Sequence, residues 1–226
     1  MITERRVATE WPISEPIHHG ASLARTRTLE TPAGTLFLQD HCRPAFVESL
    51  RVDSGLRAFA RLPEREHQLL ITIAKRSDCR LTLVYTPEGV IVAEVTLAPG
   101  EAWWAGLEHV YEGAVQVSSH WRRLGIARQV LSFALELDML EDMIIFALGL
   151  SWHWDTEGLG INRFQYRKLI EWLFAAYGFV EYLTYEPNIT MDPANIFLAR
   201  IGSRVDLQTI NQFYNGMLRS QNLPGL

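Results

Sequence analysis

Length, composition and charge exclude several classes of protein. The chain has 226 residues, 48% of them hydrophobic, which suits one sizeable domain with a substantial core. Its formal net charge is -5 at pH 7, so it lacks a basic surface and no nucleic-acid partner is expected. We find no apolar run of membrane length and no signal-peptide pattern, so we expect a cytoplasmic protein with no membrane partner. Cys42 and Cys79 have no metal-like spacing, and neither a metal site nor a disulfide framework is expected.

The first third of the chain is predicted to hold an arm, a strand and two helices. Residues 1–34 precede the first periodic segment and are predicted to form an N-terminal arm. Residues 35–39 are the first predicted strand. Apolar residues within 46–59 predict a helix that is interrupted near Gly55. Residues 63–76 carry acids at the start and bases at the end, which is the charge polarity of a second helix.

Strands dominate the middle of the chain, and they alternate with helices after it. Residues 81–86 and 90–97 are rich in strand formers and are joined by Pro87-Glu88-Gly89, which predicts a hairpin. The remaining predicted elements are a valine-rich strand at 110–117, a helix from Ile126 with apolar residues on one face as far as Leu140, a buried strand at 142–150, a helix at 166–177 closed by Gly178, strands at 179–184 and 196–200, and a final helix capped by Asp206.

The segment between the strand at 110–117 and the helix from Ile126 has the features of an anion-binding turn. Gly125 permits a tight turn, and Ala127 keeps the start of the helix narrow. Unpaired N–H groups and the positive end of the helix dipole favour a phosphate group there, and Arg122 and Arg123 add positive charge. The pattern predicts a diphosphate ligand, with an ordinary surface turn as the alternative interpretation.

This segment resembles a known coenzyme-binding loop. Arg122-x-x-Gly125-x-Ala127, placed between a strand and a helix, is similar to the acetyl-CoA loop of the GNAT N-acetyltransferases. The resemblance implies an α/β (α+β) fold of the GNAT type over residues 35–202, with a mixed central sheet flanked by helices and a splayed central strand. Residues 203–226 are then expected to form a C-terminal helix packed on the same domain.

Motifs in the second half of the chain resemble a narrower family. They are Trp152-His153-Trp154-Asp155, Tyr166-Arg167-Lys168, and the series from Glu186-Pro187 through Pro193-Ala194-Asn195 to Ala199-Arg200-Ile201-Gly202. All are similar to the acetoin-utilization acetyltransferases. This resemblance implies an enzyme that uses acetyl-CoA as cosubstrate, without a metal, and acetylates a lysine of a partner protein. An acetyl-CoA synthetase is the type of target that the family implies.

The resemblance also implies which residues form the site. The pyrophosphate is expected at Arg122, Arg123, Leu124, Gly125, Ile126 and Ala127, and the thioester carbonyl near Gln116, Val117 and Ser118. Glu112 in the central strand is the first choice for the general base, and His153 beside Asp155 is the second. A strand-edge carboxylate and a histidine in an aromatic corner are their structural alternatives. His120, next to the loop, is either a phosphate contact or a surface residue.

Two residues depart from the pattern that the resemblance implies. The acetoin-utilization pattern has an acid where this chain has Gln116, and glutamine cannot accept a proton. Many GNAT enzymes have a tyrosine where this chain has Phe174, so Tyr166 is the substitute proton donor to the departing thiolate, with Tyr177 or water as alternatives. These departures leave two other functions open, which are a catalytically weak module that binds a synthetase and a small-amine N-acetyltransferase.

Overall fold

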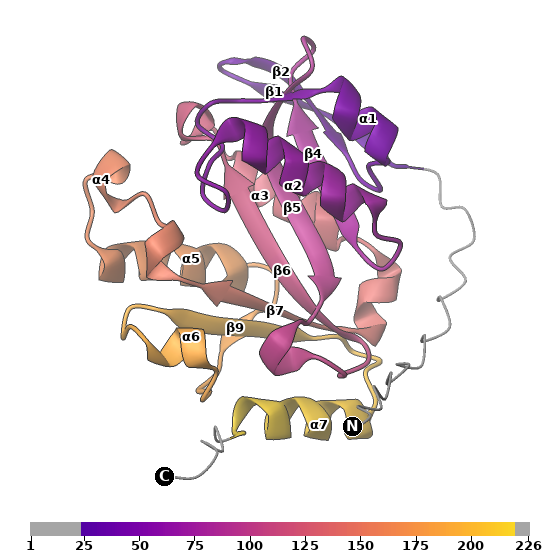
Figure 1. Ribbon diagram of the computed structural model, residues 1–226, viewed down its shortest axis with the longest axis vertical. Helices are drawn as coiled ribbons and strands as arrows, with labels where there is room; N and C mark the ends of the chain where they lie inside the picture. Colours follow the sequence, from indigo (N-terminus) through magenta and orange to yellow (C-terminus); the bar gives the residue numbers. More distant parts are fainter. Residues whose placement is uncertain (1–23, 220–226) are drawn as a thin grey trace, which may run out of the picture.

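One mixed sheet runs through the protein. The computed structural model describes residues 24–219 (Figure 1). Nine strands form the sheet in the order β1-β2-β4-β5-β6-β7-β9-β8, with β3 paired to β5 outside this path. The strands are β1 (Thr26–Thr31), β2 (Gly34–Gln39), β3 (Arg51–Val52), β4 (Arg80–Tyr85), β5 (Val90–Pro99), β6 (Val110–Val117), β7 (Ile144–Gly149), β8 (Val180–Glu181) and β9 (Ile196–Ile201).

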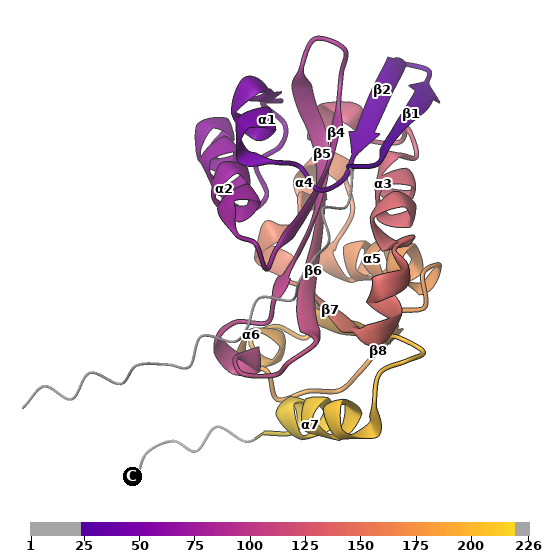
Figure 2. The same ribbon diagram turned by 90° about the vertical axis from the view of Figure 1, so that its right-hand side faces the viewer.

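Helices cover both faces of this sheet. They are α1 (Pro44–Ser49), α2 (Pro63–Lys75), α3 (Ile126–Leu135), α4 (Thr156–Leu159), α5 (Arg163–Ala175), α6 (Pro187–Thr190) and α7 (Leu207–Met217). Figure 2 shows α1 and α2 on one side of the sheet and α3 and α5 on the other. Within residues 24–219, no helix combines the length and hydrophobicity that crossing a bilayer requires.

Each face of the sheet has its own apolar core. Under α2, Leu70 and Ile71 pack with Leu81, Leu83 and Ile91 of the sheet. Under α3, side chains at helical spacing enter a larger cluster on the opposite face of the sheet: Ile126, Val130, Phe133 and Ala134 of the helix with Ala93, Val95, Leu97 and Ile145 of the sheet. The predicted apolar face of this helix is therefore confirmed.

The neighbouring parallel strands β6 and β7 diverge along their length. They pair only where residues 110–112 of β6 face residues 144–146 of β7. Beyond Glu112, β6 continues to Val117 paired with β5, and β7 continues to Gly149 paired with β9. The main chain of residues 113–117 consequently has no strand on its β7 side. The predicted mixed sheet with flanking helices is confirmed, and its central strands are splayed.

The structure corrects the prediction for the N-terminal region. The strand expected first, at residues 35–39, is β2, and β1 precedes it inside the segment that we assigned to an arm. The register pairs Thr26 with Gln39, so β1 extends the sheet at its edge. The rest of the predicted arm, residues 1–23, lies outside the described residues.

The helix predicted within 46–59 is mostly a loop. Only Pro44–Ser49 is helical, and after β3 the chain forms an irregular segment at residues 53–62, which we name the crossing loop. Gly55 in this loop lies so close to Ser119 that an added Cβ would be 2.9 Å from its main-chain nitrogen. Side chains of Gln116 and Glu66 bind the N–H groups of Ala58, Phe59 and Ala60, so these groups are not available to a helix.

Two later elements are shorter than predicted, and the last one is as expected. The helix from Ile126 ends at Leu135 because the chain turns to bring Asp138 and Asp142 to Arg204. The strand predicted at 179–184 is reduced to two residues, since the following chain turns toward α7. In α7, the Asp206 side chain accepts a hydrogen bond from the Thr209 N–H at 2.9 Å, as the cap prediction requires.

Candidate active site

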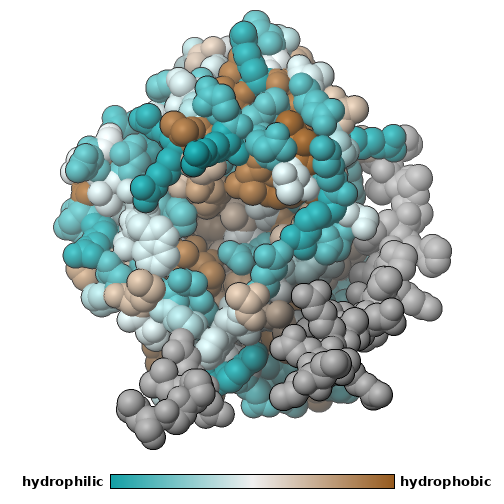
Figure 3. Space-filling model, viewed as in Figure 1, coloured by the Kyte–Doolittle hydropathy of each residue, from teal (hydrophilic) through white to brown (hydrophobic). Residues whose placement is uncertain are grey.

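A large cleft opens where β6 and β7 diverge. Its volume is about 1290 Å³, and it is lined by the crossing loop, β5, β6, β7, α5 and the turn before α3. Figure 3 shows this face of the molecule hollowed at its centre, with hydrophobic residues in the recess and hydrophilic residues around it. A cleft of this size can hold a long ligand with an apolar portion.

The turn before α3 presents main-chain N–H groups to this cleft. Gly125 is the N-cap of α3 with a φ of 75°, and no side chain caps the helix there. Arg123 also has a positive φ, of 63°, which is uncommon for a residue with a side chain. The first N–H groups of an uncapped helix have no partner within the helix, and such a terminus binds anions. Arg122, Arg123, Gly125, Ile126 and Ala127 line the cleft.

The two arginines of this turn differ in their surroundings. Arg122 donates to Oδ2 of Asp155 at 2.5 Å across the cleft, and this hydrogen bond lowers the pKa of Asp155. Arg123 is exposed. The ion pair fixes the Arg122 guanidinium beside the helix N-terminus, while Arg123 can move to a bound anion. The Leu124 side chain packs on the core and does not line the cleft.

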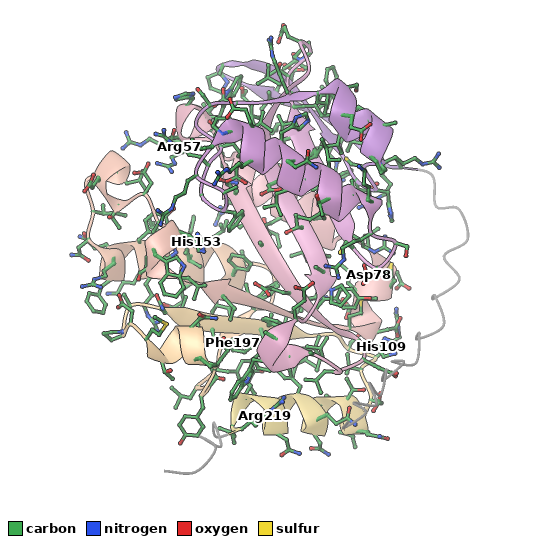
Figure 4. The ribbon with its side chains drawn as sticks, viewed as in Figure 1. Arg57, Asp78, His109, His153, Phe197 and Arg219 are labelled. Atoms are coloured by element: carbon green, nitrogen blue, oxygen red, sulfur yellow. The ribbon has the colours of Figure 1, made fainter. Side chains whose placement is uncertain are left out.

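A hydrogen-bonded chain crosses the cleft through the crossing loop. The Ala58 N–H donates to Oε1 of Gln116 on β6. Nδ1 of His153 donates to the Ala58 carbonyl oxygen at 2.8 Å, which leaves Nε2 as the acceptor of a neutral ring. The His153 ring also contacts Phe59 edge-on, with 5.5 Å between ring centroids. In Figure 4, Arg57 of the loop and His153 lie on either side of the opening.

Two buried carboxyl groups lie under the crossing loop. Glu66 of α2 is fully buried, and its Oε1 accepts from the N–H groups of Phe59 and Ala60 at 2.8 and 2.9 Å. Glu94 of β5 lines the cleft, and its Oε1 accepts from Nε2 of Gln116 at 3.3 Å. Burial, together with the nearby Glu66, raises the pKa of Glu94 to about 8. The sequence prediction named neither residue as part of the site.

Glu112, the first-choice base, also lines the cleft. It lies in the part of β6 that is still paired on both sides, opposite Ala98 of β5 and Phe146 of β7. Burial raises the pKa of Glu112, and Glu186 and Glu101 add to this effect. Glu112 therefore lies at the end of the cleft where β6 and β7 are still paired.

The aromatic residues of α5 divide into cleft and core positions. Tyr166 lines the cleft and stacks on Trp154, with 5.1 Å between ring centroids and 4° between ring planes. Burial raises the pKa of Tyr166, so its hydroxyl keeps its proton at neutral pH. Phe174 is buried and lines the cleft. Tyr177 donates its hydroxyl to the Arg128 carbonyl oxygen at 2.6 Å and lies outside the cleft lining.

Ser118 and His120 both contact Asp53, at the start of the crossing loop. Ser118 is fully buried and donates to Oδ1 of Asp53 at 2.5 Å, while the neighbouring Ser119 lines the cleft. Nδ1 of His120 lies 2.9 Å from the same Asp53 oxygen. Gln116 and Val117 line the cleft. Across residues 24–219, no group of three or more His, Cys, Asp or Glu side chains is arranged to hold a metal ion.

The chain is similar in sequence to two curated proteins. No family model matches it. The acetoin utilization protein AcuA of Bacillus subtilis (strain 168) is 30% identical over 190 residues, which are 82% of this chain and 90% of that protein. The chain belongs to the AcuA family. AcuA of Bacillus licheniformis is 29% identical over 200 residues, which are 87% of this chain and 94% of that protein.

Solved structures agree with this AcuA-family membership and establish the fold. The crystal structure of an acetoin utilization protein from Exiguobacterium sibiricum 255-15 has a TM-score of 0.82 and 28% identity, covering 88% of this chain and 97% of that one. The GNAT domain of S. lividans PAT has a TM-score of 0.50 at 15% identity, covering 77% of this chain and 95% of that one. This AcuA-like protein therefore has the GNAT acetyltransferase fold, and both resemblances drawn from its motifs are confirmed.

One signal in the sequence of this AcuA-family member indicated the buried acid that the prediction missed. Glu94 is the single charged residue in the apolar strand VIVAEVTLAP, residues 90–99. A charge in a strand that is buried on both faces is rarely accidental. Glu66 gave no such signal, because an acid in the first turn of a helix is also favoured by the helix dipole.

Proposed function

We propose that this protein is an acetyl-CoA-dependent N-acetyltransferase that acetylates a lysine of a partner protein, with an acetyl-CoA synthetase as the type of target. One observation carries the proposal. The uncapped N-terminus of α3 and the diverging edge of β6 face one cleft. Membership of the AcuA family supports the link to acetoin utilization.

The residues of the cleft fit coenzyme A in two parts. The amides from Arg123 to Ala127 and the two arginines suit the pyrophosphate, because the site offers N–H donors and positive charge. The β7-facing edge of residues 113–117 offers main-chain groups to the amide-containing pantetheine arm. Acetyl-CoA supplies an activated acetyl group as a thioester.

The side chains around the divergence suit acyl transfer to an amine. A main-chain N–H of residues 113–117 stabilises the negative charge that develops on the thioester oxygen. Tyr166 keeps its proton at neutral pH and donates it to the departing sulfur. Groups that can accept the proton lost by the amine also line the cleft, and Glu112 and His153 are the two that the sequence predicted.

Apolar side chains at the rim of the cleft support a macromolecular acceptor. Leu169 and Trp172 line the cleft from α5 and are 49% and 59% exposed. A protein surface around the target lysine can bury such side chains, whereas a small amine cannot.

Titration calorimetry with acetyl-CoA tests the coenzyme site. Gly125→Glu places a carboxylate at the amides and is expected to weaken acetyl-CoA binding by on the order of 100-fold. Gly106→Glu is the matched control, because Gly106 has a φ of 83° and open space around it but lies outside the cleft lining. Equal affinity in wild type and Gly125→Glu would contradict the assignment of the loop.

Acetylation of a purified acetyl-CoA synthetase tests the acceptor. The protein is incubated with the synthetase and acetyl-CoA, and mass spectrometry measures acetyl-lysine on the synthetase.

Gln116 and Phe174 favour a second candidate, a catalytically weak binding module, because neither can move a proton. Stable association with the synthetase and no acetylation would favour that module, and acetylation of a small amine instead would favour the small-amine enzyme.

A further inference from the structure

Glu94 is a buried acid whose burial has no structural explanation. Only 1% of its surface is exposed, and it lies opposite Leu83 of β4 and Gln116 of β6. Its Oε2 is buried without a hydrogen-bond partner, and no arginine or lysine within residues 24–219 forms an ion pair with it. A buried carboxyl group left in this state costs stability, so its retention favours a functional role.

Glu66, the other buried acid nearby, differs from Glu94 in having a structural task. One of its oxygens binds two N–H groups of the crossing loop. It does not line the cleft, whereas Glu94 does. The two carboxyl groups therefore have separate roles, with Glu66 supporting the loop and Glu94 facing the ligand space.

Gln116 is oriented so that it presents a donor to Glu94. Because the Ala58 N–H can only donate, it fixes Oε1 of Gln116 toward the loop and leaves Nε2 toward Glu94. Gln116 also lies beyond Glu112, in the part of β6 from which β7 has diverged. A carboxyl group from the neighbouring strand β5 therefore contacts β6 at the point where its main chain is no longer paired with β7.

We propose that Glu94 is the general base for the incoming amine and that Gln116 is the residue that positions it. The proposal rests on the proposed function. The lysine arrives as an ammonium ion, and the Glu94 carboxylate accepts one of its protons. The nitrogen lone pair then forms the C–N bond to the acetyl carbonyl carbon, and the C–S bond breaks. The nitrogen loses its second proton, one proton completes the coenzyme A thiol, and Glu94 returns the other to solvent.

The groups around Glu94 suit it to this reaction. Glu66 of α2 adds negative charge, Gln116 of β6 donates a hydrogen bond, and His153 and the arginines of the crossing loop line the same cleft. A base whose pKa is about 8 is matched to an ammonium group near neutral pH. Glu112 and His153 also line the cleft, but their side chains form no hydrogen bond with Gln116.

The pH dependence of acetylation by Glu94→Gln tests this role. We measure kcat/KM for acetylation of a purified acetyl-CoA synthetase from pH 6 to 9, and the Kd of acetyl-CoA by calorimetry. The variant is expected to lose at least about 100-fold in kcat/KM at pH 7 and to keep its acetyl-CoA affinity. In wild type, kcat/KM should rise with an inflection near pH 8, and this rise should be absent from the variant.

Two further variants separate a catalytic role from a structural one. Glu66→Gln keeps an oxygen that can accept hydrogen bonds from the loop N–H groups, but it removes the negative charge near Glu94. The inflection in kcat/KM should therefore move to lower pH, while kcat/KM at high pH should equal that of wild type. The exchange variant Glu94→Gln/Gln116→Glu returns a carboxylate to the same contact and should recover at least about tenfold of the lost rate.

Each outcome has a defined meaning. If Glu94→Gln keeps kcat/KM within about threefold of wild type with the same pH profile, the role of Glu94 is overturned while the proposed function stands. If the wild type does not acetylate the synthetase, the proposed function is overturned, and the role of Glu94 in that reaction falls with it.

Discussion

The main chain of Ala58 connects the two sides of the cleft, although alanine has no functional side chain. It binds Gln116 on β6 through its N–H and His153 after β7 through its carbonyl oxygen. The main chain of one residue therefore holds a side chain of β6 and a side chain of the segment that follows β7. Because acyl transfer depends on placement of the reacting groups to within about 1 Å, a shift of Ala58 would disturb both sides at once.

At the same scale, Tyr166 and Tyr177 allow a paired prediction on α5. Tyr166→Phe removes only the hydroxyl and keeps the ring that stacks on Trp154. We expect kcat for acetylation to fall by roughly tenfold with little change in KM, because the departing sulfur loses its proton donor. Steady-state kinetics with acetyl-CoA as the varied substrate measures this effect.

The control for Tyr166 is Tyr177→Phe on the same helix. The Tyr177 hydroxyl donates to the Arg128 carbonyl oxygen and does not face the cleft. Its loss should lower the free energy of unfolding by about 1 kcal/mol and leave kcat unchanged. If both variants have the same kcat as wild type, Tyr166 is not the proton donor, and water reaching the sulfur is the remaining candidate.

At the scale of elements, the crossing loop is held at its start by Asp53. Oδ1 of Asp53 accepts from the Gly55 N–H at 2.9 Å and from the Ser118 hydroxyl at 2.5 Å. Burial alone would raise the pKa of Asp53, but these hydrogen bonds and the charge of His120 lower it overall. The carboxylate therefore stabilises the folded protein at neutral pH, and this stabilisation is lost as the pH falls through the lowered pKa.

Removal of this contact should loosen the loop without unfolding the domain. For Asp53→Ala we expect a loss of about 1–3 kcal/mol in the free energy of unfolding. We also expect the KM for the synthetase to increase more than the KM for acetyl-CoA. Denaturant unfolding and steady-state kinetics measure the two effects. Asp206→Ala is the control, since it uncaps α7 away from the cleft and should lower stability by about 1 kcal/mol with KM unchanged. A KM increase of equal size in both variants would contradict a specific role for the loop.

Elements whose signals are local could be predicted from the sequence, and those that depend on distant contacts could not. The strand at 110–117 and the turn at Gly125 follow from valine content and glycine position, and both are present. The crossing loop depends on a contact between Ala58 and Gln116, which are 58 residues apart, so its apolar residues resembled a helix. The side chains of Ser118 and Leu124 lie outside the cleft lining, which the sequence could not show, because side-chain direction depends on strand register and packing.

At the scale of the whole molecule, an aromatic cluster holds together the closed end of the divergence. Trp104 stacks on Phe197 of β9 with 5.1 Å between ring centroids, and it contacts Phe146 of β7 and Phe213 of α7. Val110 and Ile144, the first residues of β6 and β7 to pair, belong to the same cluster. Burial of these large side chains stabilises one end, so the strands can separate at the other end without exposing the core.

Glu94 makes the stability of the whole molecule depend on pH. Burial and the neighbouring Glu66 raise its pKa from 4.5 to about 8, so the folded protein keeps a proton that the unfolded chain releases above about pH 4.5. The resulting stabilisation is complete below pH 4.5 and is lost as the pH rises to about 8. Glu94→Gln has no proton to lose, so its free energy of unfolding relative to wild type should increase by roughly 2–4 kcal/mol between pH 5 and pH 9. Urea unfolding followed by circular dichroism at pH 5, 7 and 9 measures this change. A difference between the two proteins that is the same at all three pH values would show that Glu94 is already ionised in the fold.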